Sequence, residues 1–171
     1  MNVMKNIRIE KVTLNIGAGG PGDKLDKSAK LLTYITGKKP VQTETMERIP
    51  TWNVRPHLKL ASKITIRKKE AHDLLKRLLK AVGNKLSDRK FDNYGNFSFG
   101  IPEYIDVDGI EYNAQLGMFG FDVAVTLERP GFRIKKRKLL NKKIPTKNKI
   151  TKQEAMDFIR KEFNVKVGDE E

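Results

Sequence analysis

The chain has 171 residues, which suits one domain or one domain with an extension. Its 35 Lys and Arg against 21 Asp and Glu give a formal net charge of +14, an excess that predicts a polyanionic partner, nucleic acid before an anionic membrane surface. Cysteine is absent, which excludes disulfides, thiolate zinc sites and cysteine nucleophiles, and no segment approaches the about 20 apolar residues of a membrane span.

The chain begins with a strand, a glycine-rich loop and a helix. Residues 11–16 alternate polar and apolar side chains, and this period of two predicts a strand with one buried face. Residues 23–36 carry apolar side chains at helical spacing after the loop, with Asp23 placed to cap the helix. A second, short strand is expected over residues 40–43.

The middle of the chain predicts three more strands and one strongly amphipathic helix. Residues 46–60 contain two prolines and no clean period, which indicates an extended loop or hairpin. A strand over residues 63–67 and a helix over residues 71–82 follow. Alternation predicts further strands over residues 97–101 and 121–127.

The last part of the chain is strongly basic. Residues 129–149 hold ten Lys and Arg and no acid, and most of their length lacks strand or helix periodicity. Basic segments of this kind are commonly disordered until they contact nucleic acid, and a flexible linker is the plainer alternative. Thr151 and Glu154 then form a capping box before a helix that reaches Phe163.

The mixture of helices and half-buried strands predicts the fold class. Because the strands alternate instead of reading as continuous apolar runs, we expect an α+β two-layer sandwich. One mainly antiparallel mixed sheet carries helices on one face and leaves its other face open to bind RNA. Residues 1–130 are expected to form the main domain, and residues 131–171 a basic extension and a C-terminal helix packed on or next to it.

The glycine-rich loop raises the alternative of a nucleotide-dependent enzyme. Its sequence GAGGPG satisfies the G-x-G-x-x-G pattern of a dinucleotide-binding turn, and Glu44 follows the second strand at roughly the distance of a ribose ligand. Three features oppose this interpretation. The preceding strand is not apolar on both faces, Pro21 removes a backbone N–H, and Asp23 places a negative charge where a pyrophosphate would bind.

No other pattern predicts catalysis or a metal site. His57 lies in the proline-flanked loop, His72 lies beside Asp73 on a helix, and no serine lies in a nucleophile elbow. A small acidic cluster around Gly109 matches no metal-ligand loop, and a solvated turn is the simpler interpretation there. We therefore expect no catalytic residue, no metal and no cofactor.

Polar side chains on two predicted strands indicate a binding surface. They are Lys11, Thr13 and Asn15 on one strand and Lys63, Thr65 and Arg67 on the other. If the strands are neighbours, the cations neutralise phosphates, and the Thr and Asn side chains reach 2′-hydroxyls and phosphate oxygens. No aromatic side chain projects there, so a structured RNA backbone fits better than splayed single-stranded bases. An ordinary solvated sheet face and a general nucleic-acid chaperone are the alternatives.

Four sequence blocks resemble a known family. KVTLNIGAG, TGKKPVQT, SKITIRKKEA and KFDNYGNFSFGI occur in the order and spacing of the 5S rRNA-binding family of the large ribosomal subunit known as L-five. The match covers roughly residues 7–130, and IPTWNVRPHLKLASK resembles the archaeal and eukaryotic form. The early first strand, the basic run and the C-terminal helix depart from the bacterial form.

The resemblance implies a non-enzymatic protein that holds 5S rRNA in the central protuberance. Together with the polar surface above, it implies an rRNA-binding set of Lys11, Thr13, Asn15, Lys38, Thr43, Lys63, Thr65 and Arg67. The loop between the second and third strands is implied to contact P-site tRNA through Asn53, Val54, Arg55, Pro56, His57, Leu58 and Lys59. Further basic RNA contacts are expected from Arg133, Lys135, Lys136, Arg137, Lys138, Lys142 and Lys143.

The resemblance also implies partners and a location. Large-subunit rRNA, neighbouring large-subunit proteins and a small-subunit head protein are the implied partners of a monomer within the ribosome, without membrane contact. Because the N-terminus lacks the apolar run of a signal peptide, we expect a soluble, cytoplasmic, ribosome-bound protein. Trp52 is expected either to stack or anchor the loop base, or to lie in the core.

Overall fold

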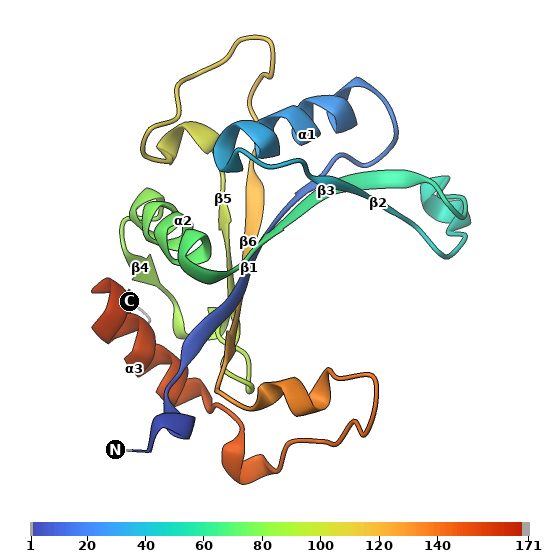
Figure 1. Cartoon of the computed structure of the whole chain (residues 1–171). Helices are drawn as coiled ribbons and strands as arrows, with labels where there is room; N and C mark the ends of the chain where they lie inside the picture. Colours follow the sequence, from blue (N-terminus) through green and yellow to red (C-terminus); the bar gives the residue numbers. More distant parts are fainter. Residues whose placement is uncertain (1, 169–171) are drawn as a thin grey trace. The chain divides into compact units, whose positions relative to one another are not determined.

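A five-stranded sheet in the order β2-β3-β1-β6-β5 is the main element of the computed structural model, which describes residues 2–168 (Figure 1). The sheet is mainly antiparallel, and three α-helices accompany it, so the predicted α+β class is confirmed. The chain forms two compact units. The terminal unit comprises residues 2–12, 67–99 and 124–168, and the central unit comprises residues 13–66 and 100–123.

The elements follow the predicted order along the chain. The sheet strands are β1 (Arg8–Gly17), β2 (Val41–Glu44), β3 (Lys59–Ile66), β5 (Phe97–Ile101) and β6 (Phe121–Glu128). The helices are α1 (Asp23–Thr36), α2 (Lys68–Ala81) and α3 (Lys152–Phe163). A second sheet pairs β4 (Lys85–Leu86) in parallel with β7 (Lys166–Val167). Alternation did not predict this pair, because a two-residue strand contains no period.

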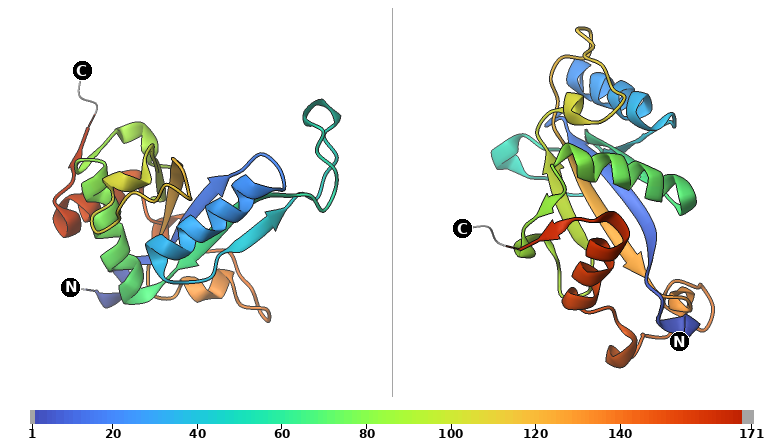
Figure 2. Two further views of the ribbon diagram at one scale, coloured as in Figure 1. Left: turned by 90° about the horizontal axis from the view of Figure 1, so that it is seen from above. Right: turned by 90° about the vertical axis from the view of Figure 1, so that its left-hand side faces the viewer.

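In the central unit, α1 lies along β3 (Figure 2, left). The fully buried Ser28 of α1 donates a hydrogen bond to the Leu25 carbonyl, and its hydroxyl also bonds the buried Ser62 hydroxyl of β3 at 2.8 Å. The predicted cap at Asp23 is wrong. Asp23 is the first helical residue, and the N-cap is Gly22, whose φ of 133° favours glycine and which offers no side chain.

In the terminal unit, α2 and α3 pack together (Figure 2, right). The His72 and Phe163 rings lie 4.7 Å apart between their centroids, and Ile159 of α3 is fully buried. The predicted capping box is confirmed: the Glu154 N–H donates to the Thr151 hydroxyl, and the Thr151 N–H donates to the Glu154 carboxylate. Residues 2 and 168, the two ends of the described chain, both belong to this unit.

Between β2 and β3 the chain forms a hairpin, as predicted. Ile49 and Val54 pair across a 3-10 turn over Pro50–Trp52, and β3 starts at Lys59, earlier than the predicted residue 63. The Trp52 side chain is 73% exposed, so its placement in the core is wrong. Within the described part of the chain, no helix combines the length and apolarity that a membrane crossing requires.

Candidate RNA-binding surface

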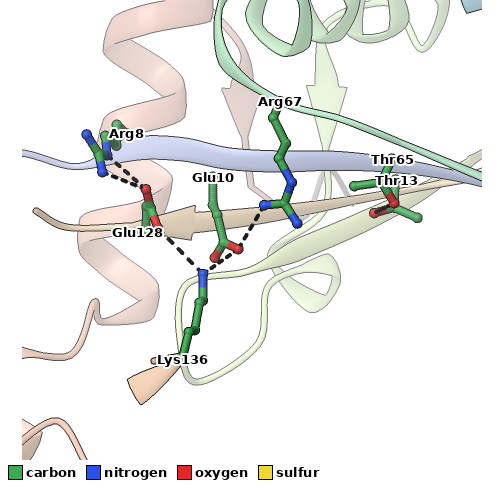
Figure 3. A network of polar contacts seen from close by, with 7 residues as sticks. All are labelled: Arg8, Glu10, Thr13, Thr65, Arg67, Glu128 and Lys136. Atoms are coloured by element: carbon green, nitrogen blue, oxygen red, sulfur yellow. Dashed lines mark hydrogen bonds and ion pairs between the residues drawn. The ribbon is translucent and has the colours of Figure 1, made fainter. Parts of the chain in front are cut away.

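The open face of the central unit carries neutral polar side chains beside a lysine. In β3, Ser62 and Ile64 are buried while Lys63 and Thr65 are exposed, which is the expected alternation. The Thr13 and Thr65 hydroxyl oxygens lie 3.4 Å apart across β1 and β3 (Figure 3). This contact confirms that the two predicted strands are neighbours and that their polar residues share a face.

Two further predicted residues of the central unit lie beside this face. Thr43 pairs with Ala61 in the antiparallel β2–β3 ladder, and its hydroxyl donates to the Ala61 carbonyl at 3.2 Å. Val41 pairs with Lys63, so alternation along β2 puts Thr43 on the same face as Lys63. Lys38 is exposed just after the helix end, where its N–H donates to the Thr36 hydroxyl.

The glycine loop uses two of its backbone donors within the chain. The N–H groups of Ala18 and Gly19 both donate to the Leu60 carbonyl of β3, at 2.9 and 3.2 Å. The Gly22 carbonyl accepts the N–H groups of Leu25 and Asp26, and Pro21 has no N–H to offer. The loop therefore connects strand to helix, and these two donors are directed to the sheet.

The terminal unit holds Lys11, Arg67 and the basic segment, and here the structure adds an unpredicted acid. The Glu10 carboxylate, only 8% exposed, accepts from the Arg67 guanidinium at 3.3 Å and pairs with the Lys136 ammonium (Figure 3). Lys136 also lies 3.6 Å from Glu128, which in turn accepts from the Arg8 Nε at 2.9 Å. Two of the predicted RNA-contacting cations are thus already paired within the chain.

The electrostatics of Glu10 follow from these partners. Burial alone would raise the pKa of its carboxyl group, but the hydrogen bonds from Lys136 and Arg67 and the charges of Lys136 and Lys11 outweigh burial. The pKa of Glu10 therefore lies below the ordinary value of 4.5, and the group stays ionised. Alternation along the strand did not predict Glu10 as a surface residue. Glu10 lies two positions before the buried Val12, so alternation places it on the buried side.

The basic segment, residues 129–149, is held at several points. Arg129 is 7% exposed, donates to Glu154 at 2.6 Å, and reaches the Asn148 and Lys149 carbonyls, so it ties both ends of the segment together. Phe132 is buried in the first turn. All seven basic residues of the segment that were predicted to contact RNA are exposed, namely Arg133, Lys135, Lys136, Arg137, Lys138, Lys142 and Lys143.

The hairpin between β2 and β3 presents most of the predicted tRNA-contacting residues. His57, with a φ of 62°, lies 3.6 Å from Glu44, and the Thr45 hydroxyl donates to the Arg55 carbonyl at 2.7 Å. Val54 is buried, and Lys59 is exposed but belongs to β3 and not to the tip. The exposed members are therefore Asn53, Arg55, Pro56, His57 and Lys59, with Leu58 half-buried.

The described residues contain no group of three or more His, Asp or Glu side chains placed to hold a metal ion. Near Gly109, Tyr104 is fully buried and its hydroxyl accepts the Asn113 N–H at 2.9 Å. This contact belongs to an ordinary packed turn. The hydroxyls, amide and lysine on the surface of the central unit offer hydrogen-bonding groups and a positive charge for binding.

Comparisons with known proteins identify the family of the chain. The family model for ribosomal protein L5 matches residues 2–55, and the model for the C-terminus of the same ribosomal family matches residues 59–158. The large ribosomal subunit protein uL5 of Sulfolobus acidocaldarius is 43% identical over 97% of this chain and 93% of its own length. Proteins of the same name from Nanoarchaeum equitans and Thermoplasma volcanium are 43% and 44% identical, over 96% and 98% of this chain and 97% and 99% of their own lengths.

Proposed function

The chain belongs to the ribosomal protein L5 family, and from that premise we propose that it binds 5S rRNA through the open face of its central unit. It is a ribosomal protein of the large subunit and not an enzyme. The nucleotide-dependent alternative is therefore wrong. A general nucleic-acid chaperone differs from this proposal in specificity, which the test below measures.

The contact between Thr13 and Thr65 carries the proposal. Two hydroxyls 3.4 Å apart on a sheet face, with Asn15 further along β1 and Lys63 on β3, combine neutral hydrogen-bonding groups with a cation. Hydroxyl and amide groups both donate and accept, so they match ribose 2′-hydroxyls and phosphate oxygens, while the lysine neutralises a phosphate. Rigid strands hold the set in place without ordering a loop.

Secondary contacts extend the proposal to the remaining predicted residues. Lys38 and Thr43 lie beside the face, and the basic segment supplies exposed cations for 5S or large-subunit rRNA. The hairpin between β2 and β3 contacts P-site tRNA. Neighbouring large-subunit proteins and a small-subunit head protein complete the proposed partners of a cytoplasmic, ribosome-bound monomer in the central protuberance.

The test compares Thr65→Glu with wild type for 5S rRNA binding. A carboxylate at the centre of the face repels phosphates, so we expect affinity to fall roughly a hundredfold while the thermal midpoint stays unchanged, because Thr65 is exposed. Thr33→Glu is the matched control, since Thr33 is an exposed residue of α1. Filter binding or fluorescence anisotropy measures the affinity at fixed salt.

Two results would contradict the proposal. Unaltered binding by Thr65→Glu would exclude this face, and equal competition by a generic RNA duplex of the same length would remove the specificity for 5S rRNA in favour of a chaperone. Wild-type affinity should fall steeply as salt rises, because phosphate contacts dominate the binding of a chain with net charge +14.

A further inference from the structure

The open face of the central unit contains a shallow hollow of about 580 Å³. It is formed by β1, β6 and β5, which are adjacent in the sheet, and by the residues at their ends. Its exposed and half-exposed lining residues are Asn15, Gly17, Gly100, Pro102, Gly120 and Asp122. The volume lies within the range of small-ligand sites, about 300–1,000 Å³.

Three glycines, Gly17, Gly100 and Gly120, line the hollow, so part of its floor is peptide backbone without side chains. A Cβ at Gly17 would meet no heavy atom within 4 Å, and one at Gly100 would lie 3.5 Å from the Asp122 carboxylate, an ordinary contact. Packing within the chain therefore does not require glycine at either position. Gly120 differs, because a Cβ there would lie 2.8 Å from the Pro102 carbonyl oxygen. A strand that lacks side chains lets a ligand lie directly against its backbone, and a flat floor suits a planar ring.

Among the described residues, Asp122 is the only charged side chain that lines the hollow. It is exposed, and within residues 2–168 it has no hydrogen-bonding or ion-pair partner. An unpaired carboxylate disfavours the binding of a phosphate, because it repels anions and has no hydrogen-bond donor to offer. The hollow therefore fits a group that presents N–H donors and not a phosphate.

We propose that the hollow binds the Watson–Crick edge of one unpaired guanine of the RNA, an inference that rests on the proposed function. Guanine presents two adjacent donors, N1–H and N2–H, which match the two oxygens of the Asp122 carboxylate. Adenine, cytosine and uracil place an acceptor beside their donor on that edge, and the acceptor repels the second oxygen. Asn15, on the neighbouring strand β1, also lines the hollow and has both a donor and an acceptor for the base or its ribose.

Removing the charge of Asp122 gives the first test. If the carboxylate binds a guanine, its removal weakens 5S rRNA binding; if it only repels phosphates, its removal tightens binding. Asp122→Asn should weaken 5S rRNA binding by roughly tenfold to a hundredfold, since it loses a bidentate base contact. Asp26→Asn, an exposed acid on α1, is the matched control and should leave affinity unchanged or slightly tighter. If Asp122→Asn tightened binding as a mere loss of repulsion, the guanine proposal would be overturned.

Filling the hollow gives a second test that leaves the charge intact. Gly17→Val adds a β-branched side chain to β1, where a Cβ meets no heavy atom within 4 Å, and should weaken 5S rRNA binding at least tenfold by displacing the base from the floor. Gly20→Val is its control, because a Cβ at Gly20 also meets nothing within 4 Å and Gly20 does not line the hollow. Thermal melts of both variants confirm that they fold.

A guanine-specific dicarbonyl reagent, which reacts at N1 and N2, identifies the base. We expect one unpaired guanine of 5S rRNA to be protected by the wild-type protein and to become reactive with Asp122→Asn. Wild type that fails to bind 5S rRNA would contradict the proposed function itself. Wild-type binding without any such protected guanine, or hollow variants that bind 5S rRNA normally but fail to assemble with subunit proteins, would overturn only the guanine site.

Discussion

Glu10 shows how one carboxylate organises the cations around it. It is nearly buried, and it holds Arg67 from the end of β3 and Lys136 from the basic segment. These contacts place part of the basic segment against β1 in the free protein. An RNA phosphate that uses either cation must therefore share it with Glu10 or displace the carboxylate.

The stability supplied by Glu10 depends on pH with a definite sign. Its pKa is lower in the folded protein than the ordinary value of 4.5, so the unfolded chain takes up a proton first as pH falls. We expect Glu10→Gln to lower the free energy of unfolding by about 1–3 kcal/mol near neutral pH. The difference in the free energy of unfolding between Glu10→Gln and wild type has its full size above pH 4.5. It shrinks as the pH falls through the lowered pKa of Glu10 in the folded protein.

Thermal unfolding of both proteins at constant ionic strength, from about pH 3 to about pH 7, measures this difference. Glu47→Gln is the control, because Glu47 is exposed and pairs with no cation among the described residues, and it should track wild type throughout. A constant gap between Glu10→Gln and wild type across the whole pH range would show that the ionised carboxylate is not the source of the stability.

Residue-scale prediction from the sequence succeeded where alternation was regular. The period of two placed Thr13 and Thr65 on one face, and the two hydroxyls lie 3.4 Å apart there. The same period fails for Glu10, whose partners Arg67 and Lys136 are distant in sequence. Nothing local to Glu10 indicates those partners, since the contacts arise only when β3 and the basic segment reach β1.

At the scale of elements, the hairpin between β2 and β3 is a self-contained unit. The Ile49–Val54 pair and the bond from Thr45 to the Arg55 carbonyl stabilise its backbone, while Trp52 remains exposed. The two prolines and the lack of a period in residues 46–60 predicted an extended loop or hairpin here. The sequence did not predict that Lys59 enters β3, because its pairing with Glu44 depends on a register shift at the end of β2.

Truncating the exposed hairpin side chains should separate two functions. Trp52→Ala combined with Arg55→Ala leaves the β2–β3 ladder untouched, so we expect 5S rRNA affinity within about twofold of wild type. Ribosomes reconstituted with this variant should bind P-site tRNA more weakly, because a cation and a stacking surface are lost. Tyr34→Ala combined with Lys30→Ala on α1 is the control and should bind tRNA normally. Unchanged tRNA binding by the hairpin variant would exclude the proposed contact.

At the scale of the whole molecule, the terminal unit joins distant parts of the sequence. Its three segments, residues 2–12, 67–99 and 124–168, share one set of contacts. The boundary at residue 130, with the basic extension and C-terminal helix packed on or next to the main domain, stays a prediction. Composition located that boundary, but composition does not show that α3 packs on α2 through the rings of Phe163 and His72.

A fragment that ends at residue 130 tests the boundary. Among the described residues it loses seven buried apolar side chains, namely Phe132, Ile150, Ala155, Ile159, Phe163, Val165 and Val167. At about 1.5–3 kcal/mol for each larger side chain, the loss approaches the whole stability of a typical domain. We expect the fragment to unfold without a cooperative transition in thermal melts followed by circular dichroism. A cooperative melt at the wild-type midpoint would show that the extension is separable.

Two point variants of the full-length protein test the role of α3 without removing any part of the chain. Ile159→Asp buries an unpaired charge in the terminal unit and should lower the melting temperature strongly. Lys161→Asp changes an exposed residue of the same helix and should have little effect. Equal stability of the two variants would contradict a structural role for the buried side of α3.

The ion pairs around Glu10 and Glu128 also change how the net charge of +14 should be counted. The salt dependence comes from counterions condensed on the RNA, which are released when a protein cation neutralises a phosphate, and a cation already paired with a carboxylate of its own chain neutralises phosphates less. Arg8, Arg67 and Lys136 are therefore poor contributors to that release. The slope of log affinity against log salt should report the unpaired lysines and arginines, and it should be shallower than the formal charge suggests.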